Sequence, residues 1–216
     1  MINADTGLSA GNRNLSKAIG RFTTATLPAA SAVPSGSVAY VIGVLTNRDV
    51  VMQSDGTWWK PYGGQQLLYT GTGEVTLTGV AAETLMDEYA LPAKLMSPRL
   101  QIRIGILTTS TNSTNSKRQR LRLGGIAGTA YSDLSYTSAT AYGSSYEVAI
   151  TVGATINAQS GPSSALFTAP LGTSTSAHVT SALDLSASDV KATFSGQVAS
   201  AGETIVLKQM TVRIIG

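Results

Sequence analysis

The sequence has no cysteine and only one histidine, His178, among 216 residues. The chain therefore has no disulfide, no thiolate metal site and no cysteine nucleophile. A transition-metal site would need carboxylates, or His178 repeated about a symmetry axis, whereas its Thr- and Ser-rich surroundings favour a solvated loop histidine. We expect no metal and no cofactor. Durability without disulfides must come from packing or from assembly, which favours an oligomer.

Charged residues are also scarce, at 12% of the chain against a usual share of roughly 25%. The net charge of +3 is a mild excess, so we expect no nucleic-acid binding. Much of the surface must consist of Ser, Thr, Gly, Asn and Gln. Thr and Val suit strands while Gly and Ser suit turns, so this composition favours a β protein over a helical bundle or coiled coil.

Long hydrophobic runs are absent. None approaches the roughly 20 residues that a membrane-spanning helix needs, so we expect no membrane insertion. The first residues, Met1 to Asp5, lack the basic start and the apolar core of a signal peptide. We expect a protein made in the cytosol, which could reach the outside through release of assembled particles by lysis.

Acidic residues are few, and their spacing does not favour catalysis. Glu83, Asp87 and Glu88 form the one local cluster, which fits a solvated turn or a surface patch facing Lys94 and Arg99. A hydrolase needs a base beside a nucleophile, or two convergent carboxylates. We therefore expect that the protein is not an enzyme.

Turn residues and alternating apolar residues divide the chain into three parts. Residues 38–44, 50–53 and 57–61 predict a small meander whose last turn contains Asp55-Gly56. A Pro- and Gly-rich break at 61–66 follows. Beyond it, strands are predicted at 67–70, 74–78, 100–106, 121–123, 146–152, 190–196 and 205–214, and one stretch, 83–88, is compatible with a helical turn. The predicted fold is all-β: an N-terminal docking arm at 1–26, a β-meander attachment domain at 27–64 and a jelly-roll β-sandwich at 65–216.

Four apolar residues are candidates for subunit or docking contacts. Leu15 and Ile19 have i, i+4 spacing and would share a helix face, although three nearby glycines make an extended arm equally compatible. Trp58 and Trp59 would point to opposite faces of an extended segment, so that one packs on the hairpin and the other on a neighbouring subunit.

A basic run and a group of tyrosines are candidates for receptor contact. In a strand, Arg118, Arg120 and Arg122 would share one face. They could bind a surface phosphate or sulphate, or they could be a solvent-facing sheet surface or pair between subunits with acids such as Glu147. Three tyrosines interleaved with Ser, Thr and Gly fit either an adaptable binding surface or ordinary strands and loops: Tyr131, Tyr136 and Tyr142.

Three blocks resemble phage proteins. Residues 108–125, with an Asn/Ser-rich loop, a basic strand and a Gly-Gly corner, and residues 180–215, with an Ala-Gly-Glu-Thr turn, are similar to the C-terminal jelly-roll modules of tailed-bacteriophage and prophage fibre or virion proteins. Residues 27–61, from Leu-Pro-Ala to Ser-Asp-Gly-x-x-Trp-x-Pro, resemble a small attachment motif of phage structural proteins.

The resemblance implies a non-catalytic virion protein, a homotrimeric tail-fibre or appendage subunit. Its partners would be itself, other virion proteins of tail or capsid, and a host surface glycan or protein for host attachment. Capsid decoration without a receptor role, and a non-viral carbohydrate-binding module, are the alternatives.

Overall fold

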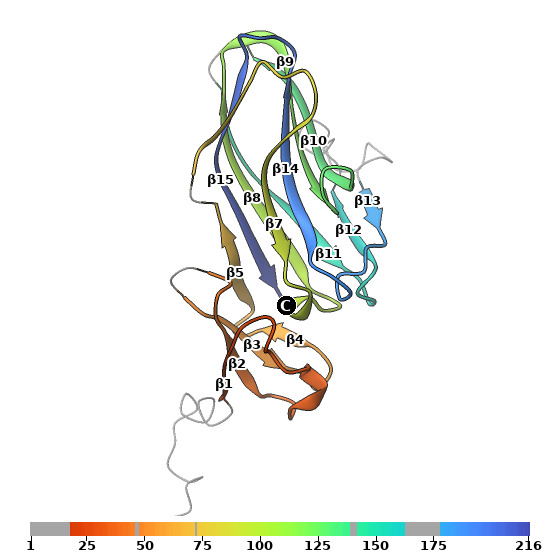
Figure 1. Ribbon diagram of the computed structural model, residues 1–216. Coiled ribbons are helices and arrows are strands. Elements are labelled where there is room, and N and C mark those ends of the chain that lie inside the picture. The colour runs from red at the N-terminus through yellow and green to blue at the C-terminus, as the bar shows by residue number, and fades with distance from the viewer. Residues whose placement is uncertain (1–17, 46–47, 72, 139–141, 163–177) are drawn as a thin grey trace, which may run out of the picture.

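The computed structural model describes residues 18–45, 48–71, 73–138, 142–162 and 178–216. Within these ranges the elements are strands, apart from two short 3-10 turns, η1 (Ala30–Ala32) and η2 (Ala93–Leu95). The predicted all-β class is confirmed. The strands form a small sheet at one end of the molecule and two larger sheets that stack into a sandwich above it (Figure 1).

The small sheet belongs to what we call the base module, residues 18–64. Its strand order is β1-β2-β3-β4, with β1 (Ala18–Phe22), β2 (Val38–Val41), β3 (Val50–Ser54) and β4 (Trp59–Pro61). Strands β2 to β4 are the expected meander. Strand β1 pairs in parallel with β2, so this part of the expected arm belongs to the sheet. Ile19 therefore lies in a strand and not on a helix, while Leu15 lies outside the described residues.

The sandwich, residues 65–216, has one four-stranded and one longer sheet. The first, here called the arginine sheet, has the order β10-β9-β14-β7. The second, here called the long sheet, has the order β13-β12-β11-β8-β15-β5, with β6 also pairing with β15. The bounds are β5 (Gln65–Thr70), β6 (Val75–Thr78), β7 (Thr84–Leu91), β8 (Gln101–Ser110), β9 (Ser113–Leu123), β10 (Thr129–Ser138), β11 (Tyr142–Val152), β12 (Gln159–Pro162), β13 (His178–Ser181), β14 (Val190–Val198) and β15 (Thr204–Ile215).

Several successive strands lie in opposite sheets, as expected for a jelly-roll sandwich. The chain changes sheet between β7 and β8, between β8 and β9, between β10 and β11, and between β14 and β15. Several strands show the alternation between core and solvent that a strand with one buried face requires. On β8, for example, Ile102, Ile104 and Ile106 are buried, while Arg103 and Leu107 face outward.

The expected helical turn at 83–88 is wrong. Residues 84–91 form β7, whose backbone pairs with β14 from Leu91↔Val190 to Thr84↔Gly196. Pairing with a strand distant in the sequence therefore overrides the local pattern. The expected Asn/Ser-rich loop is also shorter than predicted, because β8 and β9 extend to Ser110 and Ser113 and leave only two residues between them.

The sandwich core changes character along its length. Near the base module it is apolar, with buried Ile102, Leu123 and Ile214. Toward the far end, here called the tip, where β8 meets β9, buried polar residues, including Thr108 and Gln119, lie among apolar ones such as Leu207. The tip and the base module lie at opposite ends of the molecule (Figure 1).

Candidate functional site

The hairpin turn between β3 and β4 fixes the positions of the two tryptophans. The Asp55 carboxylate accepts hydrogen bonds from the backbone N–H groups of Thr57, at 2.9 Å, and Trp58, at 2.7 Å. Gly56 provides the positive φ of 95° that the turn requires. Trp58 and Trp59 then point to different sides, as predicted from their adjacency.

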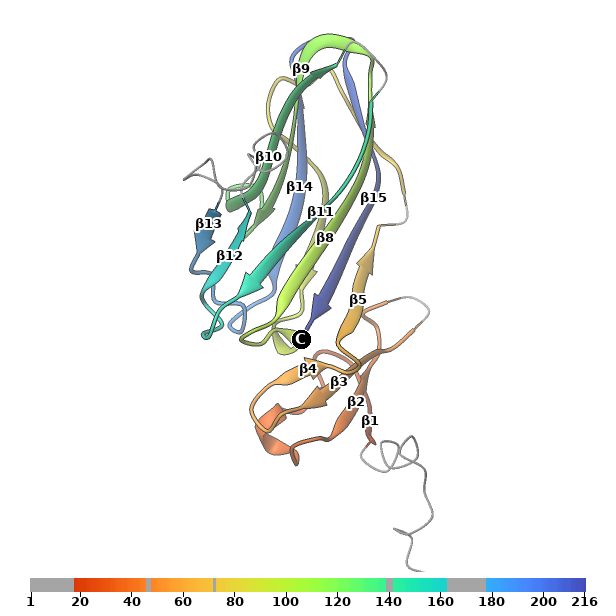
Figure 2. The ribbon, with the colours of Figure 1, turned by 180° about the vertical axis from the view of Figure 1, so that it is seen from behind.

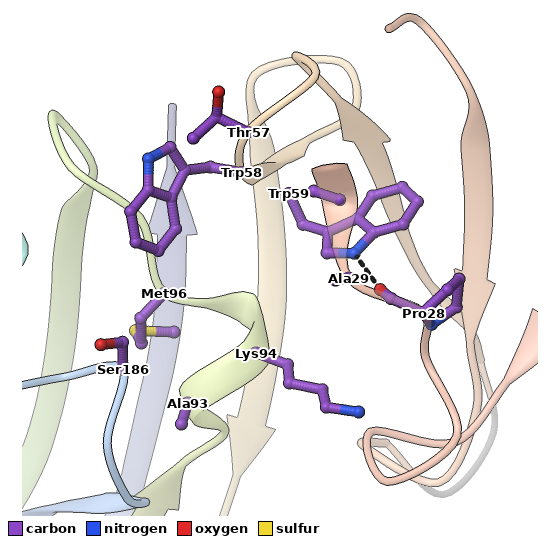
Figure 3. Close-up of a pocket in the computed structure, with 10 residues that line it drawn as sticks. Pro28, Ala29, Thr57, Trp58, Trp59, Ala93, Lys94, Met96 and Ser186 are labelled. Atoms are coloured by element: carbon purple, nitrogen blue, oxygen red, sulfur yellow. Dashed lines mark hydrogen bonds between the residues drawn. The ribbon is translucent and has the colours of Figure 1, made fainter. Parts of the chain in front are cut away.

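Trp59 belongs to the core of the base module. Its side chain is buried, and its indole N–H donates to the backbone oxygen of Pro28 at 2.9 Å. Trp58 is half-buried and faces the end of the sandwich, with its ring near Met96 and Ser186 (Figure 3). Within this chain, Trp58 therefore lies at the seam between the base module and the sandwich. Its expected contact with another subunit stays a prediction.

A cleft of about 310 Å³ lies at this seam. Residues of both modules line it: Pro28, Ala29, Ala30, Thr57, Trp58 and Trp59 from the base module, and Ala93, Lys94, Met96 and Ser186 from the sandwich (Figure 3). None of these lining residues is an acid or a histidine, so they supply no carboxylate pair and no general base for hydrolysis.

Two lysines connect the modules across the seam. The Lys94 ammonium donates to the backbone oxygens of Ala25 and Leu27, both at 2.8 Å, and Lys60 donates to the backbone oxygen of Pro98. Burial lowers the pKa of Lys60. Buried side chains of the two modules also form one continuous hydrophobic cluster. The seam therefore serves to hold the sandwich on its base.

The three arginines of β9 share the outer face of the arginine sheet, as the alternation predicts. Arg120 pairs with Glu83 at 2.8 Å and with Asp133 at 3.2 Å. Arg122 pairs with Glu83 at 2.9 Å, and Arg118 forms a two-point contact with Asp133. Within this chain Glu147 lies on the long sheet and pairs with Arg103, and its suggested pairing with an arginine of another subunit stays a prediction.

The two carboxylates of this network are held in their charged form. Burial works against the charge of Glu83, but hydrogen bonds from Arg122 and Ser195 outweigh it and lower the pKa of the Glu83 carboxyl. Burial also opposes the charge of Asp133, and hydrogen bonds from Arg118 and Arg120 again outweigh it and lower the pKa of Asp133. Arg118 is the most accessible of the three arginines, with 43% of its side chain exposed. An external anion would have to compete with carboxylates already bound there.

The tyrosines do not form one exposed surface. Tyr131 is completely buried, and its hydroxyl bonds to Ser181 at 2.7 Å, so the expectation that it contacts a receptor is wrong for this structure. Tyr136 is half-buried and accepts a 2.7 Å hydrogen bond from Gln119. The Tyr142 backbone pairs with Ser110, while its side chain lies outside the description.

Sequence reasoning missed a buried ion pair at the tip. Lys117 and Glu203 are in contact at 2.6 Å, and their side chains are 0% and 5% exposed. Thr111, Ser113 and Asn115 also donate to the Glu203 carboxylate. Lys117 begins the basic run, yet the alternation that places Arg118 outside places Lys117 inside the sandwich. That alternation is the sequence signal that indicates its burial.

Among the described residues, no group of three or more His, Asp or Glu side chains could hold a metal ion. The side chain of His178 lies outside the description. No helix in the described ranges is long and apolar enough to cross a membrane.

Comparison with known proteins gives distant structural likenesses only. No protein-family model matches the sequence, and a search of curated proteins gives no match. The CBM2 module of the evolved Dit protein of Lactobacillus casei BL23 phage J-1 aligns with 69% of this chain and 96% of the module, at 11% identity and a TM-score of 0.30. VP2 of the infectious bursal disease virus subviral particle aligns with 84% of this chain and 47% of VP2, at 10% identity and a TM-score of 0.29. The solved structures similar to this chain thus include a phage module and a viral capsid protein.

Proposed function

We propose that this chain is a structural, non-enzymatic subunit of a tailed-phage particle, a homotrimeric fibre or appendage protein. Its N-terminal region and base module dock it to the particle, and the sandwich projects with its tip outward for host attachment. The observation that carries the proposal is the end-to-end arrangement of a small module and a sandwich whose tip lies far from it (Figure 1).

The contacts at the seam support a docking role for the base module and a projecting role for the sandwich. Lys60, Lys94 and the continuous apolar cluster join the modules at several points, so that a load on the sandwich is transmitted to the base. The residues lining the cleft provide no catalytic pair, which fits a binding role. The charge-poor, hydroxyl-rich composition also fits a particle surface.

The absence of cysteine permits a direct test of orientation. Ala201→Cys places one thiol at the tip, and Ser31→Cys places one in the base module; both positions are exposed in the single chain. In purified particles that carry the variants, we expect a maleimide reagent to label the thiol at the tip and to leave the thiol in the base module protected, while both should react in the isolated subunit. Equal labelling of both positions in the particle, or protection of the tip alone, would contradict docking by the base.

The oligomeric state is tested by the solution mass of the full chain. Light scattering should give three times the 22.2 kDa of one chain. A monomeric mass would contradict the proposal of a trimeric appendage and favour a monomeric binding module.

A further inference from the structure

A small hollow of about 210 Å³ lies on the outer face of the arginine sheet, toward the tip. Neighbouring strands β10, β9 and β14 form its floor (Figure 1). Ser135 and Gln197 stand directly beside Arg118 in the two ladders, and Ser116 precedes Arg118 on the same face of β9. Ala81, in the segment that leads into β7, borders the hollow. One arginine and two hydroxyl groups therefore surround this hollow.

Positive charge exceeds negative charge in the network beside the hollow. Three arginines share two carboxylates: Arg118, Arg120 and Arg122 pair with Glu83 and Asp133 only. One positive charge of this network therefore has no carboxylate of its own. Arg120 and Arg122 are mostly covered, whereas Arg118 is 43% exposed. Solvent thus reaches the excess charge mainly at Arg118, which is the arginine that lines the hollow.

Hydrogen-bond donors also remain available there. Arg118 donates to Asp133 through Nε and Nη2, and its Nη1 group has no acceptor among the described residues. The hydroxyls of Ser116 and Ser135 are 3.4 Å apart, so one can donate to the other and one hydroxyl hydrogen is left for a further acceptor. An anion could accept from these donors without displacing Asp133. Because no acid lines the hollow, its chemistry suits an oxyanion.

The size and lining of the hollow restrict what can carry that oxyanion. Pockets for drug-sized ligands begin at roughly 300 Å³, so this hollow admits one charged group with the ring that bears it. No aromatic residue lines it, and its apolar lining is limited to small side chains such as Ala81 and Val198. It therefore lacks the anchor pocket that a protein partner usually fills, while its hydroxyls can bond to those of a sugar.

We propose that this hollow binds a carboxylate, sulfate or phosphate group carried by a saccharide of the host surface. The proposal rests on the proposed function and names the chemistry of its receptor, since the tip is the end that projects. Nη1 of Arg118 binds the charged group, and the hydroxyls of Ser116 and Ser135 bind its oxygens or the sugar. Asp133 is a positioning residue that holds the guanidinium through Nε and Nη2. Since Arg118 is partly exposed, binding weakens as ionic strength rises.

The test is a ligand titration of the full-length chain by saturation-transfer NMR. The probes are methyl glucuronide, a glucose sulfate ester and a glucose phosphate ester, with methyl glucoside as the neutral control. Inorganic sulfate and phosphate are added as competitors at matched ionic strength. Arg118→Gln removes the proposed contact. Arg103→Gln is the matched control, because Arg103 is 42% exposed and also pairs with one carboxylate, but lies on β8 in the long sheet, which faces the reader in Figure 2. Circular dichroism verifies that both variants fold.

For the acidic saccharide that binds most tightly, we expect Arg118→Gln to raise the dissociation constant at least about tenfold and Arg103→Gln to leave it unchanged. Methyl glucoside should bind at least about tenfold more weakly than that saccharide. Equal affinities of Arg118→Gln and Arg103→Gln would overturn the site. Competition by an inorganic anion at the concentrations at which the saccharide binds would overturn the assignment to a saccharide.

Failure of this site can be told apart from failure of the proposed function. If no acidic saccharide binds, but the thiol of Ala201→Cys is labelled in particles, the site is wrong and the projecting sandwich stands. If that thiol is protected in particles, both are wrong, because the tip and the nearby hollow would then face the particle and not the host.

Discussion

Truncation of Trp59 should unfold the base module, because its side chain fills the centre of a small core. The side chain is 3% exposed, and it donates a hydrogen bond to the Pro28 oxygen. Trp59→Ala loses the packing and leaves a cavity, which costs about 3–5 kcal/mol, and the unpaired carbonyl adds about 1 kcal/mol. Trp59→Phe retains most of the apolar volume and should cost about 1–2 kcal/mol.

Trp58→Ala is the matched comparison at the neighbouring residue. Its half-buried ring lines the seam, so we expect a loss of about 1 kcal/mol in the free energy of unfolding. The base module should remain folded, while its unfolding separates from that of the sandwich. Trp58 therefore contributes to coupling between the modules, and Trp59 to the stability of one of them.

Urea unfolding monitored by tryptophan fluorescence measures both effects. The chain has two tryptophans, so each variant retains a single reporter, and circular dichroism follows the sandwich strands in parallel. Equal losses for Trp58→Ala and Trp59→Ala, or an unchanged midpoint for Trp59→Ala, would refute the assignment of separate roles to these adjacent residues.

Two further predictions concern the charged clusters. Hydrogen bonding by Lys117 lowers the pKa of Glu203 from 4.5 to about 2, so the stability that this carboxylate contributes is complete above pH 4.5 and is lost as the pH falls toward 2. Glu203→Gln should therefore flatten the dependence of unfolding free energy on pH across that window. Urea unfolding at several pH values measures this dependence, and a variant with the same pH dependence as the unaltered chain would contradict the assignment. Arg120→Met deprives the Glu83 and Asp133 carboxylates of the most buried arginine that binds them, and should cost about 2–3 kcal/mol. Arg118→Met, at a more exposed position, should cost less than about 1 kcal/mol; similar losses for the two variants in thermal unfolding would show that burial does not distinguish them.

Local pattern is enough to predict the class of structure and several orientations. The alternation in β9 places Arg118, Arg120 and Arg122 on one face, and the adjacency of Trp58 and Trp59 places them on different sides. The turn at Asp55-Gly56 can also be predicted from the sequence. Each of these follows from the two-residue period of a strand or from the backbone preference of glycine, which neighbouring residues determine.

Pairing between distant segments cannot be predicted in the same way. Glu83 binds arginines that are 37 and 39 residues away, and β7 forms against a strand about 100 residues later. From the sequence alone, residues 83–88 are compatible with a helical turn. No local feature indicates that they pair with β14. Tyr131 likewise resembles a surface tyrosine in the sequence, and only the closed sandwich buries it.

The sequence by itself therefore determined an all-β chain and the strand face that Arg118, Arg120 and Arg122 share. Only the tertiary structure decided which sheet covers which, that β1 joins the base module, and that Lys117 meets Glu203 inside the tip. The physical reason is that strand periodicity is a local property of the backbone. The choice of partner strand depends instead on burial and hydrogen bonding summed over the whole chain.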